Sequence, residues 1–369
     1  NLVAIPVFSI VLVPLVLIGV FRQLSWGTPD FLWNAGGWLA NAVMAGLAAV
    51  ARIPAAGFAV TPPSLHAALL AVIGVALTLA WHPGRGRPIG ALALLPLLYP
   101  GQHSLPDAAF RLTVLDAGHG LATVIETRNH RLVYDTGARF ASGFDIGRDI
   151  VLPVLRARGD PDMLVVSHAD NDHSGGMTAL IAAYPELTVL AGPDVEHAGG
   201  WVCAAGQRWR LDNVEFELLH PRAGFVGSGN DGSCVLRITA PGGSALLTGD
   251  IERAGEAAVI ARGNTDVDIV VAPHHGSATS SSPAFVAATS PRIAVFSAGF
   301  GNRWNFPVTE VVARWCEAGA AVYVTGEHGA IEIEVGTDAS GAVARRNVRR
   351  RYWNPGATPR CGESPTVTL

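Results

Sequence analysis

A ten-residue stretch in the middle of the chain, residues 167–176, carries two imidazoles and two carboxylates around a turn. These side chains belong to His168, Asp170, Asp172 and His173. The apolar run 163–166 precedes them, so they stand where a buried strand ends and its loop begins. Imidazole suits zinc and manganese, and carboxylate oxygen extends the choice to harder ions, so the set can hold one or two divalent cations. The alternative is a helix cap formed by Asp172 or Ser174, but a cap needs one such side chain, not four.

The composition changes along the chain, with an apolar front and a mixed remainder. Leu2 to Phe21 is uncharged and long enough to cross a bilayer. Residues 31–50 and 64–81 are further candidate spans, and residues 89–99 a partial one; the second could instead lie in the membrane interface. Buried helices of a soluble domain are the alternative for all four. The chain opens on Asn1 without a charged leader, so we expect a fragment of a longer membrane protein.

Charge and cysteine content exclude few classes of function. The formal net charge of −4 does not by itself indicate a nucleic-acid binder. The four cysteines lack C-x-x-C spacing, which argues against a cysteine zinc site, and disulfides would be allowed outside the cytoplasm. The basic segment 345–353 ends in Tyr352 and Trp353, so it can follow a phosphate backbone while its aromatic rings stack on bases. A solvated arginine-rich tail is the equal alternative.

Five motifs occur in order between residues 115 and 277. They read LDAGHG, VYDTG, SHADNDHSGG, LLTGD and APHHGS. Together they resemble the metallo-β-lactamase superfamily, whose His-x-His-x-Asp-His motif is present here with Asp170 in place of the second histidine. That His-x-Asp-x-Asp-His variant resembles the ComEC family, the DNA-uptake channel proteins of naturally competent bacteria. The hydrophobic front matches the membrane part of that family less specifically.

The resemblance implies an α/β fold, the αββα metallo-β-lactamase-type sandwich, preceded by transmembrane helices. We expect residues 1–105 to be transmembrane segments that end the competence domain, residues 106–344 to be the metallo-β-lactamase-like domain, and residues 345–369 to be a basic C-terminal tail. The local pattern agrees with this fold. Alternating strands from residue 110 to 134 form a meander, and strands then alternate with helices.

The resemblance also implies roles for individual residues. The implied metal ligands are His168 and Asp170 on one cation, Asp172, His173 and His274 on the other, and Asp250 between them. The implied catalytic residues are Asp172 and His275, and His275 would protonate a leaving oxygen or contact a phosphate. The implied substrate contacts are Asn230, Ser233, Asn302 and Arg303. The implied supporting residues are Asp116 and Asp231.

The sequence departs from the family pattern at three places. His119 stands where members usually carry glutamine, and we expect no ligand role for it. No histidine stands near Asn230, where hydrolytic members usually have a ligand, so either Asp231 supplies an oxygen or the metal binds weakly there. Phe306 occupies a position where histidine is common, which puts any proton transfer assigned to that position in doubt.

Two divalent cations about 3.5–4 Å apart would clamp a phosphodiester. Because Asp170 makes the site rich in oxygen, manganese suits it at least as well as zinc. The leading hypothesis is a multi-pass protein of the bacterial cytoplasmic membrane whose extracytoplasmic domain degrades one DNA strand while the other crosses, together with other DNA-uptake proteins. The alternatives are a degenerate domain that only binds DNA or partners, and a membrane-tethered hydrolase of another substrate such as a β-lactam.

Overall fold

The computed structural model describes residues 4–27, 30–51, 65–80, 86–98, 105–196, 200–227, 229–336, 340–348, 351–354, 361 and 367–368. The chain divides into two compact units, Asn1–Val60 and Thr61–Leu369. The first contains helices, and the second contains three further helices and an α/β sandwich.

The N-terminal unit begins with one continuous helix, Ala4–Trp26. It comprises α1 (Ala4–Pro6), the π-helical turn η1 (Val7–Leu12) and α2 (Val13–Trp26). Among the described residues, this is the one helix that is long and apolar enough to span a bilayer. The second candidate span forms α3 (Asp30–Ala51), which is 22 residues long.

The third candidate span is α4 (Leu65–Ala80), which is shorter than a full crossing. The partial span forms α5 (Gly86–Leu92) and α6 (Leu95–Leu98). Glycines let α4 and α5 approach closely, since a Cβ on Gly74 would lie 2.7 Å from the carbonyl oxygen of Gly90. Such small-residue contacts are typical of helices packed in membranes.

Two sheets form the rest of the described chain. In spatial order, the nine strands of the first are β16 (Val367–Thr368), β15 (Ser340–Ala344), β14 (Ile331–Val335), β1 (Phe110–Val114), β2 (Ala122–Glu126), β3 (Arg131–Thr136), β4 (Met163–Val166), β5 (Thr188–Ala191) and β6 (Trp201–Val202). The seven described strands of the second are β13 (Ala321–Val324), β12 (Ile293–Phe296), β11 (Ile269–Val271), β10 (Gly243–Leu247), β9 (Val235–Ala240), β8 (Val214–His220) and β7 (Arg208–Leu211).

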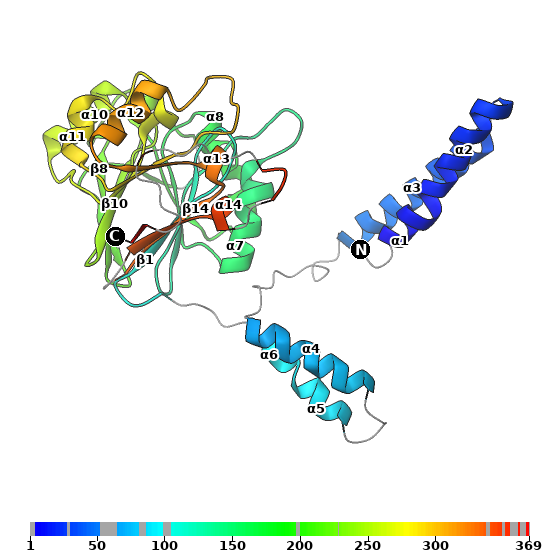
Figure 1. Ribbon diagram of the computed structural model, residues 1–369. Helices are drawn as coiled ribbons and strands as arrows, with labels where there is room; N and C mark the ends of the chain where they lie inside the picture. Colours follow the sequence, from blue (N-terminus) through cyan, green and yellow to red (C-terminus); the bar gives the residue numbers. More distant parts are fainter. Residues whose placement is uncertain are drawn as a thin grey trace. The chain divides into compact units, whose positions relative to one another are not determined.

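The sheets pack face to face and helices cover their outer faces (Figure 1). On the second sheet lie α10 (Arg253–Arg262), α11 (Pro283–Thr289) and α12 (Thr309–Glu317). On the first lie α7 (Leu152–Arg158), which continues the π-helical turn η2 (Gly147–Val151), and α9 (Met177–Ala183). The predicted αββα sandwich is therefore confirmed.

Side chains along each strand alternate between the core and the outer face of the sheet. In β1, Phe110, Leu112 and Val114 face the core between the sheets and are fully buried, whereas Arg111 lies on the outer face and pairs with Glu334. Burying side chains of this size stabilises the fold by about 1.5–3 kcal/mol each. The hydrophobic pattern therefore fixes which face of each strand points inward.

Part of the expected C-terminal tail, residues 345–369, joins the first sheet. β15 pairs antiparallel with β14 just before the tail, α14 (Arg345–Val348) follows β15, and β16 within the tail pairs antiparallel with β15. Arg345 binds Glu332 at 2.7 Å, and Cys361 is disulfide-bonded to Cys316 of α12. Residues 349–350, 355–360 and 362–366 of that tail, and residues 101–104 before the sandwich, lie outside the described residues.

Candidate metal centre

The chemistry-bearing loops meet at one end of the sandwich because each follows the carboxyl end of a strand. β3 and β4 are parallel neighbours in one sheet, and β10 and β11 are parallel neighbours in the other. Asp135 lies at the end of β3, residues 167–173 follow β4, Asp250 follows β10, and residues 274–275 follow β11. Parallel strands in α/β folds place ligands at this edge.

The first group of potential ligands consists of His168, His173 and Asp250, all buried. The Nε2 of His173 lies 3.1 Å from Oδ1 of Asp250. The Nε2 of His168 is buried and has no hydrogen-bond partner among the described residues. A buried polar atom without a partner is costly, so this nitrogen fits a site that receives a cation.

Asp135 orients this group. Its Oδ2 accepts a hydrogen bond from Nδ1 of His173 at 2.7 Å, and its two oxygens also accept from the backbone N–H and hydroxyl of Ser167, at 2.6 and 2.7 Å. Asp135 is fully buried. A carboxylate bound to one imidazole nitrogen fixes the ring so that the other nitrogen faces the metal. No role was predicted for Asp135 from the sequence, although it lies in the middle of the second motif, VYDTG.

A second group consists of His119, Asp172 and His275, whose ligand atoms lie within 4.8 Å of one another. The Nε2 of His275 lies 3.3 Å from Oδ2 of Asp172, and its Nδ1 donates to the carbonyl oxygen of Ser297 at 2.8 Å. That backbone hydrogen bond directs Nε2 inward, as is usual for a metal ligand. His119 belongs to this group, although no ligand role was expected for it from the sequence.

Asp250 lies between the two groups. Its Oδ1 faces His173 and its Oδ2 lies 3.3 Å from Nε2 of His275. The hydroxyl of Ser233 accepts a hydrogen bond from the Asp250 backbone N–H at 3.1 Å and lies 3.3 Å from Nδ1 of His168. Ser233 is fully buried, so its position fits support of these ligands rather than contact with a substrate.

His274 and Asp170 lie at the edge of this arrangement. The Nε2 of His274 is 3.9 Å from Asp250, while its Nδ1 lies 3.1 Å from a carboxylate oxygen of Glu252. Both His274 and His275 have left-handed backbone angles, φ 49° and 53°, which turn their rings in different directions. The carboxylate of Asp170 is 59% exposed and lies 3.5 Å from Nε2 of His168.

Three of the predicted substrate contacts remain, and they are Asn230, Asn302 and Arg303. Asn230 faces His274 and Glu252, at 3.4 and 3.2 Å. The side chain of Asn302 bonds to the backbone of Gly299 and Phe306, so it holds its own loop. The guanidinium of Arg303 lies 4.1 Å above the ring of Trp304.

The two predicted supporting residues act on the backbone around the centre. Asp231 caps α10, because its Oδ1 accepts from the backbone N–H groups of Glu252 and Gly255 at 2.8 and 2.9 Å. Asp116 pairs with Arg346 of α14 and so joins its loop to the basic segment. Burial raises the pKa of Asp116, and the charge of Arg346 opposes that rise.

The electrostatics of the centre favour cations. Burial works against charge at Asp250, but His173 and His275 hold the pKa of its carboxyl well below the usual range. Burial likewise opposes a charge on His275, but Asp250 and Asp172 raise its pKa to about 9. Burial also opposes a charge on His173, but Asp250 and Asp135 raise its pKa well above the usual value. The His/Asp groups are therefore compatible with metal binding.

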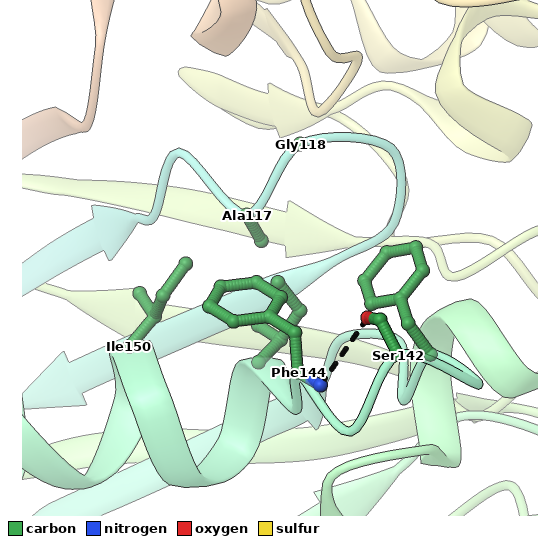
Figure 2. Close-up of a pocket in the computed structure, with 7 residues that line it drawn as sticks. Ala117, Gly118, Ser142, Phe144 and Ile150 are labelled. Carbon is green, nitrogen blue, oxygen red and sulfur yellow. Dashed lines mark hydrogen bonds between the residues drawn. The ribbon is translucent and has the colours of Figure 1, made fainter. Parts of the chain in front are cut away.

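An apolar cavity of about 340 Å³ adjoins the loop that carries His119. Ala117 and Gly118 lie on one side of it and Phe144 and Ile150 on the other (Figure 2). Phe140 also lines the cavity, and both phenylalanines are nearly half exposed. The loop that carries them is tied to the ligand loop, because the backbone N–H of Arg139 donates to the side chain of Asn171 at 3.3 Å.

The geometry agrees with comparisons of the whole chain. The model of the metallo-β-lactamase superfamily matches residues 115–299, which include both ligand groups. The chain belongs to this superfamily. The competence protein family matches residues 1–85. The resemblance to competence proteins that carry a metallo-β-lactamase-like domain is thus confirmed.

Competence protein ComA of Neisseria gonorrhoeae is 36% identical over 359 residues, which are 96% of this chain and 50% of that protein. Recombination protein 2 of Haemophilus influenzae is 28% identical and covers 90% of this chain and 46% of its own length. The chain thus spans about half the length of these relatives. A solved metallo-β-lactamase from Cronobacter sakazakii is 14% identical, with a TM-score of 0.31, over 42% of this chain and 73% of its own.

Proposed function

We propose that this protein takes part in DNA uptake across the cytoplasmic membrane during natural transformation, and that its sandwich hydrolyses the phosphodiesters of one strand with two divalent cations, manganese or zinc. The observation that carries the proposal is Asp250, whose two oxygens face two separate His/Asp groups in a chain related to competence proteins. A carboxylate that can bind two cations at once suits two-metal phosphodiester hydrolysis, in which two ions a few ångströms apart act on the same phosphate.

We assign the ligands from the geometry. His168 and His173 would hold the first cation, with Asp170 at its exposed side. Asp172 and His275 would hold the second, and Asp250 would serve both. His275 thus takes the ligand position that the family resemblance gave to His274. His274 is left for substrate contact, because its imidazole is 21% exposed at the edge of the site.

When bound, the cations would neutralise the charge of the phosphodiester and lower the pKa of an attacking water. The residues of the chain would position these ions and keep the site negatively charged. The apolar cavity beside the His119 loop would accept a base next to the cleaved bond, because aromatic rings stack on bases irrespective of sequence.

The membrane assignment has separate support. The match to competence proteins covers the helical N-terminal unit, and Ala4–Trp26 can cross a bilayer. We propose a multi-pass protein with an extracytoplasmic sandwich. The Cys203–Cys234 and Cys316–Cys361 disulfides support that orientation, because disulfides persist in oxidising compartments.

The test is degradation of labelled single- and double-stranded DNA by the full chain in detergent, with manganese, zinc or EDTA. Asp172→Ala and His173→Ala should abolish metal-dependent cleavage, whereas Asp160→Ala, an exposed carboxylate away from the two ligand groups, should leave it unchanged. Cleavage that survives in EDTA or in both site variants would refute the nuclease.

A second function has its own support. The lack of a histidine near Asn230 and the presence of Phe306 favour a domain that binds DNA or partners without cutting. Folded, metal-loaded protein that binds DNA but does not cleave it would support this alternative. Hydrolysis of nitrocefin would instead indicate a β-lactam substrate.

A further inference from the structure

The two ligand groups differ in the number of histidines that the sequence motifs contribute. Among the ligands assigned above, the first cation has two imidazoles, His168 and His173, whereas the second has one, His275. His119 comes from a different loop, between β1 and β2, and its position in the family is usually glutamine. Yet the structure brings a ring nitrogen of His119 within 4.8 Å of the ligand atoms of Asp172 and His275.

The His119 ring is directed at the site and is short of other partners. Its Nδ1 is buried and has no hydrogen-bond partner among the described residues. Its ring centroid lies 4.7 Å from that of His275. A buried imidazole nitrogen without a donor or acceptor is unfavourable unless something else, such as a cation, occupies the space before it.

Stacking holds the ring in this place. The His119 ring lies parallel to that of Trp304, with 4.0 Å between centroids and 17° between planes. The guanidinium of Arg303 lies over the same indole, and Phe306 lies 5.8 Å from the imidazole. These contacts come from the loop that follows β12, so the orientation of His119 depends on the opposite sheet.

The backbone of the His119 loop is fitted to the ligand loop as well. A Cβ on Gly120, which has φ +128°, would lie 2.5 Å from the carbonyl oxygen of Asp172. The backbone N–H of Leu121 donates to the same carbonyl at 3.0 Å. His119 and Asp172 are therefore held at a fixed separation by the chain itself, which is the pre-organisation that a ligand pair needs.

We propose that His119 is a ligand of the second cation, beside Asp172 and His275, and that Trp304 is its positioning residue. The inference rests on the proposed two-cation centre but not on nuclease activity. Imidazole favours zinc, whereas oxygen ligands suit manganese. Replacing an amide by His119 therefore shifts the second site towards zinc, and the preference for zinc over manganese is the property that a merely structural His119 would not control.

The test is equilibrium dialysis of the full chain in detergent against zinc and, separately, manganese, with metal content measured by mass spectrometry. His119→Gln should leave the first equivalent unchanged and weaken the second by at least about 100-fold for zinc, because the loss of a ligand should cost no less than the loss of a group that orients one, and by less for manganese. His130→Gln is the matched control, because His130 lies in the turn between β2 and β3 and pairs with Asp162. Two equivalents bound by His119→Gln with the wild-type affinities would overturn the proposal, as would a wild type that binds a single cation.

A second pair of variants separates ligation from folding. Trp304→Phe keeps an aromatic face and should bind the second zinc as the wild type does, whereas Trp304→Ala should weaken it. Cobalt added as the second equivalent should give an altered visible absorption band in His119→Gln and an unaltered band in His130→Gln. An identical band in both variants would contradict ligation by His119. Wild type that loads both cations and cleaves no DNA would refute the nuclease while leaving this inference standing.

Discussion

Asp135→Asn tests how far the buried carboxylate controls the metal centre. An ionised carboxylate only accepts hydrogen bonds, so Nδ1 of His173 must carry a proton, and Nε2 is the nitrogen available to a metal. Asparagine keeps the size of the side chain and one acceptor oxygen for the backbone N–H of Ser167. Its amide N–H groups would then face Nδ1 of His173, which favours the opposite tautomer, with the proton on Nε2.

The expected loss of metal affinity follows from the hydrogen bond between Asp135 and His173. Disturbing the group that orients a metal-bound imidazole weakens metal binding by about 10–100-fold. At about 1.4 kcal/mol per tenfold change, this is about 1.4–2.8 kcal/mol for the first cation. The second cation should be affected less, because Nδ1 of His275 is bound to the Ser297 carbonyl and not to Asp135.

The assay is calorimetric titration of zinc into wild type and Asp135→Asn, with circular dichroism to confirm folding. Asp145→Asn is the matched control: Asp145 is also buried and accepts from the backbone N–H of Arg148, but belongs to neither ligand group. The control should bind zinc as the wild type does. Wild-type affinity for both cations in folded Asp135→Asn would refute this account of His173.

Three further results are expected. His275 has a pKa of about 9 in the metal-free protein. Its proton competes with metal below that pH, so the apparent zinc Kd should fall as pH rises from 6 to 9 in calorimetry, with protons released on binding. Because this pKa is raised, the imidazolium stabilises the metal-free fold fully below about pH 6.5 and progressively less as pH rises through 9, as thermal unfolding would record. Phe140→Ala with Phe144→Ala should weaken single-stranded DNA binding in fluorescence anisotropy by about 1–3 kcal/mol per lost stack and leave metal content unchanged; unaltered binding would exclude the cavity as a base site. Replacing Cys316 and Cys361 by serine should reduce the free energy of unfolding by about 3–4 kcal/mol for a 45-residue separation, measured by denaturant titration; an unaltered midpoint would contradict this.

The five ordered motifs predicted the sandwich through the family that they resemble, and the alternating strands agreed with that fold. The meander expected from residue 110 to 134 is present as β1, β2 and β3. Strands β7 and β15 were not predicted. The outward positions of β7 carry Arg208 and Arg210, and β15 holds a glycine and no large side chain, so neither has a strong apolar signal, and pairing with β8 and β14 defines them.

The ligands in the loop after β4 could be predicted from the local sequence, unlike the rest of the centre. Four polar side chains at the end of one strand are a local pattern, so His168, Asp170, Asp172 and His173 could be named from the chain alone. The choice between His274 and His275 could not, since adjacent residues differ only in the direction that their backbone angles give to the rings. The proposed assignment of His275 in place of His274 rests on the hydrogen bond to the Ser297 carbonyl, more than 20 residues away.

By itself, the sequence determined the order of the motifs and the apolar N-terminal helix, because these depend on residue types next to one another. The fold class followed from the family that the ordered motifs resemble. The tertiary structure alone decided that Asp135 orients His173, that His119 reaches the site and that Arg346 binds Asp116. These contacts join segments from 38 to 230 residues apart. No local spacing encodes such pairs, because they arise only when two sheets pack and bring their loop ends together.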